Sequence, residues 1–337
     1  MTASAIEAVA TWLPETTRTS ADTRERLTRL NAGLRLPERV VERISGVERV
    51  HIADEGMQAS DLGVEACRRL EERHPGALTN IDLLIFASAT QDLIEPATAH
   101  IVAHKLGLTV PVFDVKNACN SVLVAIEVAD ALIRAGNYRR VLICTGEKPS
   151  VGTKWRVETP AEAFRAFPGY TMSDAGAALI LRAADGDEPS RILGTAAVAR
   201  SEHWSVGTLA AGGTVDPDAT FGRYFDMNGT ALFDAFRAIP QSVWDELIRR
   251  SGVSVADAKV VGIHQVATAH FGAVREILRV RDDQLVPVIA RHGNMASCGL
   301  PRQLEMAVDE GGLSRGDPAL LVGLAGGISA GTVGLRW

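Results

Sequence analysis

The stretch VFDVKNACNS at residues 112–121 places Cys119 between a short apolar strand and a long apolar helix. Residues 112–115 are typical of a buried strand, and residues 121–135 are apolar on nearly every side, as in a core helix. Unpaired N–H groups at a helix start, and the positive end of the helix dipole, favour a thiolate and lower the pKa of a thiol. The stretch therefore makes Cys119 a candidate nucleophile. The alternative is a small buried hydrophobic side chain, the usual state of a free cysteine.

Composition excludes several classes of protein. The 337 residues are 46% hydrophobic, which is enough for a large core. The net charge is −6 with no basic block, so we expect no nucleic-acid partner. Because no signal peptide and no transmembrane stretch is recognisable, we expect a cytoplasmic chain without a membrane partner. The four cysteines show no CxxC spacing and no nearby histidine cluster, so we expect no metal site and no disulfide framework.

The same order of strands and helices recurs in both halves of the chain. The predicted strands are 81–87, 112–115 and 140–146 in the first half and 258–263, 285–289 and 319–324 in the second, with helices at 97–106, 121–135, 269–278 and 300–309. The tetrapeptide ATAH also occurs twice, at residues 97–100 and 267–270. This pattern predicts an α/β fold of two duplicated βαβαβ lobes, residues 1–172 and 173–337, with largely parallel sheets.

The junction between the two halves has its own composition. Residues 148–172 are rich in turn formers and large side chains, which predicts an excursion over a pocket. Strands at 175–181 and 192–198 are expected to follow.

Three further elements are expected to meet Cys119. His264 ends one strand, Asn294 lies in the loop that corresponds to the Cys119 loop, and Gly326 and Gly327 form a turn after the last strand. Ligands bind at such strand ends in parallel sheets. In acyl transfer the thiolate would attack a thioester, the imidazole and amide would stabilise the oxyanion, and glycine N–H groups would approach the substrate. Each residue also has a structural explanation: a hydrogen-bonded histidine, an asparagine in a left-handed turn, and hairpin glycines.

Four segments carry a family resemblance. Residues 114–119, 262–265, 292–294 and 326–327 resemble the β-ketoacyl-ACP synthase III group of the thiolase-like condensing enzymes, over essentially the whole chain. The resemblance implies a five-layered αβαβα fold, a homodimer, and an acyl-CoA or acyl-ACP thioester as substrate without a separate cofactor. It also implies that Cys119 is acylated and that His264 and Asn294 stabilise the charge.

The sequence departs from the housekeeping enzyme at two places. Val40 and Ile44 stand where that enzyme has the tryptophan and arginine that sandwich the adenine of coenzyme A. Glu95 aligns with Gln265 by the 170-residue offset, and its surroundings resemble the long-chain acyl-CoA condensing enzymes of olefin and β-lactone pathways, where a glutamate is the base. The alternative for Glu95 is a first-turn residue that the helix dipole favours beside Pro96.

The expected function is a Claisen-type condensation of acyl thioesters through an acyl-Cys119 intermediate, in fatty-acid, polyketide or related secondary metabolism. One alternative is an acyltransferase that delivers the acyl group to an alcohol or amine, and another is an inactive partner subunit of a heterodimeric synthase. Arg275, Arg279 and Arg281 form either a basic rim for an acidic carrier protein or a solvated helix face.

Overall fold

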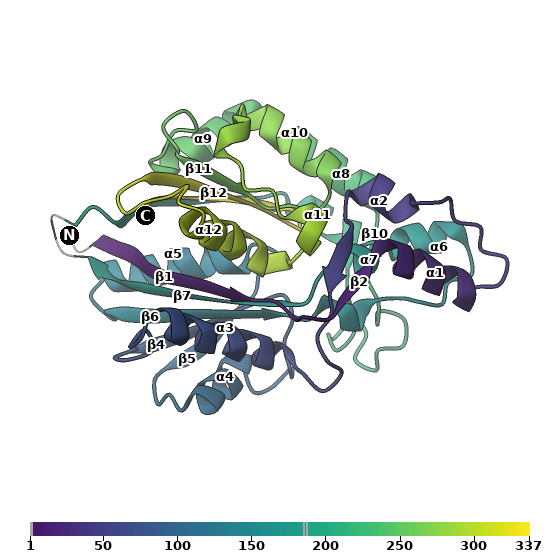
Figure 1. Cartoon of the computed structure of the whole chain (residues 1–337), viewed down its shortest axis with the longest axis horizontal. Coiled ribbons are helices and arrows are strands. Elements are labelled where there is room, and N and C mark those ends of the chain that lie inside the picture. The colour runs from purple at the N-terminus through teal and green to yellow at the C-terminus, as the bar shows by residue number, and fades with distance from the viewer. Residues whose placement is uncertain (1–2, 185, 187) are drawn as a thin grey trace.

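A computed structural model of the chain describes residues 3–184, 186 and 188–337. Two β-sheets alternate with three layers of helices (Figure 1). The first sheet has the strand order β1-β7-β6-β4-β5 and the second β11-β12-β13-β8. The strands of the first sheet are β1 Ala3–Trp12, β7 Ala175–Ala184, β6 Arg140–Glu147, β4 Leu83–Ala87 and β5 Val112–Val115. Those of the second are β11 Val260–Ile263, β12 Pro318–Ala325, β13 Ser329–Arg336 and β8 Arg191–Ala199.

Helices cover both faces of each sheet. Helices α3 and α4 pack on the outer face of the first sheet, α5 and α12 lie between the sheets, and α8, α9 and α10 cover the second sheet (Figure 1). Their bounds are α3 Ala59–Arg73, α4 Thr98–Leu106, α5 Ser121–Arg134, α12 Gly299–Asp309, α8 Gly229–Arg237, α9 Gln241–Ser251 and α10 Thr268–Leu278. The expected five-layered αβαβα fold is confirmed.

Most of the smaller elements lie toward the end of the molecule that is on the right in Figure 1. The smaller elements are β2 Thr17–Thr19 paired with β3 Arg49–His51, β9 Gly207–Thr208 paired with β10 Asp226–Met227, and the helices α1 Ser20–Leu30, α2 Val40–Ser45, α6 Pro160–Arg165, α7 Pro168–Thr171 and α11 Ile289–His292. Short 3₁₀ segments occur at Pro149–Gly152, Ser201–Val206, Asp282–Gln284 and Ala296–Cys298.

The expectation of largely parallel sheets is wrong. Strand β4 runs parallel to β5 and β6, and β11 runs parallel to β12, but β7 is antiparallel to both β1 and β6. In the second sheet β13 is antiparallel to β12 and β8. Two strands that the sequence pattern missed, β1 and β13, account for much of this, because β13 follows β12 through a tight turn and such a hairpin must be antiparallel.

The predicted strand at 285–289 is also wrong. This segment pairs with no strand of the described chain and then enters α11. Its backbone groups bond to the Gln265 side chain: Oε1 accepts from the N–H groups of Val288 and Ile289, at 2.9 and 3.0 Å, and Nε2 donates to the Val286 carbonyl at 2.9 Å. A buried side chain thus satisfies the groups that a neighbouring strand would otherwise bond.

The two halves repeat each other locally as well as in element order. Ala118 and Ala296 both have a φ of 46°, in the left-handed region, and each lies just before a helix between the sheets. The chain passes from the first sheet to the second between β7 and β8, which is later than the boundary expected between residues 172 and 173.

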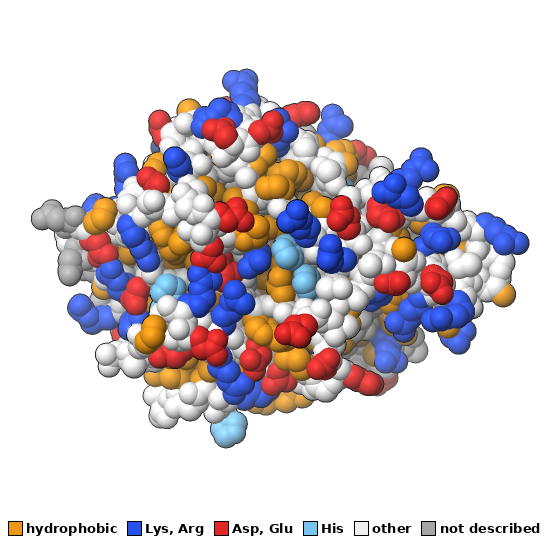
Figure 2. Space-filling model, in the orientation of Figure 1, with side chains coloured by type: hydrophobic (Ala, Val, Ile, Leu, Met, Phe, Trp, Pro, Cys, Tyr) orange, Lys and Arg blue, Asp and Glu red, His pale blue; other side chains and the backbone are white. Residues whose placement is uncertain are grey.

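Surface charge is mixed in sign, and the described residues include no membrane helix and no metal-binding cluster. Basic and acidic side chains are interspersed over the face in Figure 2. Within the described residues, no helix has the length and apolar character needed to cross a membrane, and no group of three or more His, Cys, Asp or Glu could hold a metal ion.

Candidate active site

One large cavity contains most of the predicted site. Its volume is about 1170 Å³, and Cys119, His264, Asn294, Gly326 and Gly327 all line it. Most of the other lining side chains are apolar, including Leu209, Phe225, Met227, Leu232 and Phe236. The expected excursion over residues 148–172 also lines the cavity, through side chains such as Val151, Phe164, Phe167 and Met172.

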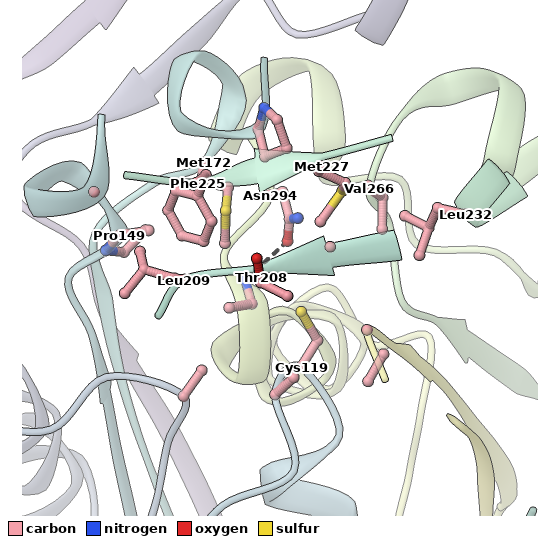
Figure 3. A pocket seen from close by; sticks show the side chains of 18 of the residues that line it. Cys119, Pro149, Met172, Thr208, Leu209, Phe225, Met227, Leu232, Val266 and Asn294 are labelled. Atoms are coloured by element: carbon pink, nitrogen blue, oxygen red, sulfur yellow. Dashed lines mark hydrogen bonds between the residues drawn. The ribbon is translucent and has the colours of Figure 1, made fainter. Parts of the chain in front are cut away.

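Both halves of the chain hold the Cys119 loop. The Ala118 carbonyl accepts hydrogen bonds from Ser121 Oγ at 2.7 Å and from Ser297 Oγ at 3.0 Å, and Ser297 belongs to the second half. On the other side of Cys119, the Asn120 amide donates to the backbone and hydroxyl oxygens of Ser329, at 3.2 and 3.0 Å. The thiol is thereby fixed at the cavity wall, with Asn294 across from it (Figure 3).

The lowered pKa expected for the Cys119 thiol is wrong. Burial raises its pKa from the usual 9.0 to about 12, and the nearby Glu147 carboxylate adds to the rise. The helix start does not compensate, because removal of water from around a thiolate costs more than a few N–H groups restore. The free protein therefore holds Cys119 as a thiol at neutral pH.

His264 presents an unbonded imidazole to the cavity. It follows β11 directly, and its backbone N–H donates to the Val322 carbonyl at 2.8 Å, which continues the β11–β12 ladder. The residue is 2% exposed, and neither Nδ1 nor Nε2 has a hydrogen-bond partner. Burial lowers its pKa from 6.5 to about 4, so the ring is neutral at physiological pH. A neutral imidazole carries one N–H group, and in His264 this donor is free to bond an acceptor on a substrate.

Asn294 is oriented by the backbone around it. Its N–H donates to the Thr171 carbonyl at 2.9 Å, and its Oδ1 accepts from the Ala296 N–H at 2.9 Å (Figure 3). The side-chain oxygen is therefore occupied, which leaves the Nδ2 group as the donor that Asn294 offers at the cavity wall.

Gly326 and Gly327 form the turn between β12 and β13 at the cavity wall. Gly327 has a φ of 110°, which a residue with a side chain rarely adopts. A Cβ on either glycine would meet no atom within 4 Å, so the backbone is open to a ligand at this point.

Glu95 is the one predicted site residue that the structure does not bring to the cavity. Its loop reaches the cavity through Leu93 and Ile94, whereas Glu95 itself is exposed and is absent from the lining residues. Gln265, the residue to which it was aligned, is 3% exposed and serves the backbone bonds described above. The alignment of the two positions therefore does not bring this carboxylate to Cys119 within one chain.

The residues considered for coenzyme A or carrier binding differ in exposure. Val40 is buried, whereas Ile44 is 42% exposed and lines the cavity. Arg275 pairs with Asp282 at 2.8 Å and Arg281 with Asp283 at 3.1 Å. These pairs weaken the basic rim that the sequence suggested.

Sequence reasoning missed a buried carboxyl group in the cavity wall. Glu147 ends β6 and is 1% exposed. Its oxygens accept from the Ala89 N–H at 3.0 Å and from Thr90 Oγ1 at 2.9 Å, while burial raises its pKa. The sequence did contain a signal for this residue, because Glu147 is a charged residue at the end of a mostly apolar strand. Its bonds indicate a role in fixing the loop at residues 89–90.

Comparison with known proteins places the chain in a family. The sequence model for 3-oxoacyl-(acyl-carrier-protein) synthase III matches residues 113–201, and the model for the C-terminal part of that enzyme matches residues 248–337. The β-ketoacyl-(acyl-carrier-protein) synthase III of Thiobacillus denitrificans is 30% identical over the full length of both chains. The chain belongs to the β-ketoacyl-ACP synthase III family. The enzyme of that name from Rhodospirillum centenum is 31% identical over 89% of this chain and 90% of its own.

Solved structures agree with this assignment. The synthase III from Thermus thermophilus superposes with a TM-score of 0.86 at 26% identity, covering 99% of both chains. A variant of OleA from Xanthomonas campestris has a TM-score of 0.89 at 22% identity, covering 100% of this chain and 98% of its own, which shows a shared fold. The expected resemblance to synthase III is confirmed.

Proposed function

We propose that this synthase III family member condenses two acyl thioesters through an acyl-Cys119 intermediate. The observation that carries the proposal is the convergence of Cys119, His264 and Asn294 on one cavity, from loops of both halves. His264 contributes a buried ring with free nitrogens, and Asn294 contributes an amide whose oxygen is already bonded. Donors held in place before the reaction are what a developing oxyanion needs.

The first step loads the acyl group. The Cys119 sulfur attacks the carbonyl of the donor thioester, so a new S–C bond forms and the donor C–S bond breaks. The proton of the Cys119 thiol ends on the departing thiol. Because burial raises the pKa of Cys119 to about 12, this proton must leave as attack proceeds. Splitting the reaction through a covalent intermediate lowers each barrier.

The second step forms the carbon–carbon bond. The α-carbon of a second thioester becomes nucleophilic through loss of CO₂ from a malonyl unit or through proton removal, and it attacks the acyl-Cys119 carbonyl. The Cys119 thiolate leaves and regains a proton, from water when CO₂ is lost and from the base that held the α-proton when a proton is removed. Because Glu95 is outside the cavity lining, the single chain supports decarboxylation, which needs no carboxylate base. Catalysis by Glu95 stays a prediction.

The substrates and the assembly are part of the same proposal. The apolar lining supports an apolar acyl group, carried as a CoA or ACP thioester, with no separate cofactor. Membership of the family supports a homodimer that works in the cytoplasm.

Product analysis tests the reaction. The purified protein is incubated with an acyl-CoA and a malonyl thioester, and the β-keto product and CO₂ are measured. We expect product from the wild type and from Glu95→Gln, and a loss of at least 100-fold from His264→Ala and from Asn294→Ala.

Other products would redirect the proposal. An ester or amide formed only when an alcohol or amine is added would establish acyl transfer instead of condensation. Product with two acyl-CoA molecules and no malonyl unit, abolished in Glu95→Gln, would establish Glu95 as the base. Failure of the wild type to accept an acyl group from any thioester would support an inactive partner subunit.

A further inference from the structure

Two histidines in the described chain have both ring nitrogens buried and without a hydrogen-bond partner, and both line the cavity. One is His264, to which the proposed function gives a role. The other is His270, in the first turn of α10. A buried polar group without a partner is costly and rare in folded proteins, so His270 needs an explanation of its own.

The surroundings of His270 offer its ring no polar contact. The ring packs edge-on against Phe233 of α8, with centroids 4.6 Å apart and an angle of 80° between the planes. The cavity-lining residues just before it, Ala267 and Ala269, are apolar. Thr268 has a hydroxyl, but that hydroxyl already donates to the Ser45 carbonyl at 3.0 Å. Phe233 thus packs against the His270 ring, and both nitrogens of that ring remain free to bond a ligand.

The repeated tetrapeptide provides an internal comparison. His100 ends the first copy of ATAH, and His270 ends the second. Each belongs to the first turn of a helix that follows a strand of its own half, yet His100 is exposed and absent from the cavity lining. The same local sequence therefore leaves one imidazole in water and half-buries the other at the cavity, with both of its nitrogens covered.

We propose that His270 is a binding residue for the thioester substrate and hydrogen-bonds an amide or hydroxyl group of it. Burial lowers the pKa of His270, so its ring is neutral and offers one donor and one acceptor. An amide or a hydroxyl matches that pair, whereas a phosphate would prefer a cation. Such a group can come from the pantetheine arm of the donor or from a polar acyl chain.

The inference rests on the proposed function, and the experiment separates the two. The rate of Cys119 acylation is measured against donor concentration for the wild type, His270→Leu, His270→Gln and His100→Leu. Two unsubstituted donors are used: the acyl-CoA, among butyryl- to palmitoyl-CoA, that acylates the wild type fastest, and the S-phenyl thioester of the same acid. The 3-hydroxy form of each is the third and fourth donor. The S-phenyl thioester has no pantetheine arm. Glutamine keeps a donor and an acceptor, and His100→Leu makes the same exchange at the exposed copy.

We expect His270→Leu to lower the acylation kcat/KM by about five- to tenfold, chiefly through KM, as for the loss of one hydrogen bond. His270→Gln retains most of the wild-type value and His100→Leu all of it. A loss confined to CoA donors assigns the bond to the pantetheine arm. A loss confined to hydroxyacyl donors on either leaving group assigns it to the acyl chain.

Three results would overturn the assignment of His270. They are wild-type kinetics in His270→Leu with every donor, an equal loss with every donor including the unsubstituted S-phenyl thioester, and no advantage of glutamine over leucine. Acyl-CoA binding by Cys119→Ala, with and without His270→Leu, gives the same comparison in the absence of chemistry. It therefore tests His270 even if the proposed reaction fails.

Discussion

Gly323 controls how closely the second sheet approaches the helix that follows Cys119. A Cβ at this position of β12 would overlap Asn120 Oδ1 and Leu123 Cδ1, and it would lie 3.1 Å from Asn120 Cγ. Gly323→Ala must therefore push aside the buried side chain of Asn120, the neighbour of Cys119, and the end of the Leu123 side chain. Overpacking of this kind costs about 1–3 kcal/mol, and loss of the Asn120–Ser329 hydrogen bonds adds about 1 kcal/mol. We expect a total loss of about 2–4 kcal/mol of unfolding free energy.

The functional consequence of Gly323→Ala is a misplaced nucleophile. Because Cys119 adjoins Asn120, we expect acylation of Cys119 to slow by roughly 100-fold, as for an error of about 1 Å in a reacting group. Urea unfolding gives the stability, and intact-protein mass spectrometry gives the rate. The matched control is Gly272→Ala in α10, where a Cβ meets no atom within 4 Å and the added methyl favours the helix. A Gly323→Ala protein with wild-type stability and acylation would refute this account of the loop.

Three further predictions concern the site. As pH falls, the unfolded chain takes up a proton at His264 before the folded one does, because the folded pKa of about 4 lies below 6.5. Stability should therefore be full above pH 6.5 and fall toward pH 4, less steeply in His264→Leu, as urea unfolding at several pH values would show. Alkylation of Cys119 by iodoacetamide should keep accelerating across roughly pH 6 to 9.5 without a midpoint, because burial raises the pKa of the thiol, and a midpoint below 8.5 would favour control by the helix dipole. Asn294→Ala should lower kcat about 100- to 1000-fold and cost about 1 kcal/mol of stability through its lost bond to Ala296, and near-normal turnover would exclude it as an oxyanion donor.

Helices and strands were predicted best where the spacing of the apolar residues and the length of the apolar run both indicated the same kind of element. The helix expected at 121–135 is Ser121–Arg134, and the strand at 112–115 is Val112–Val115. The segment 285–289 was mistaken for a strand because Val286, Val288 and Ile289 are buried, while its backbone is satisfied by the Gln265 side chain. Such long-range side-chain bonds leave no periodic trace in a sequence.

The positions of the site residues were predicted better than their pKa values. Cys119, His264 and Asn294 reach one cavity because equivalent loops of a duplicated fold meet there. The pKa of Cys119 was predicted in the wrong direction, since a helix start is visible in the sequence but burial and the charge of Glu147 are set by tertiary packing. The same limit applies to His270, whose local sequence is identical to that of the exposed His100.

The central claim is that Cys119 is the residue that carries the acyl group. The most direct measurement is peptide mass spectrometry of the wild type and Cys119→Ala after incubation with an acyl-CoA. We predict one added acyl group in the wild type, located on the peptide that contains Cys119, and none in the variant. An acyl group on another residue, or an equal adduct on Cys119→Ala, would contradict the account.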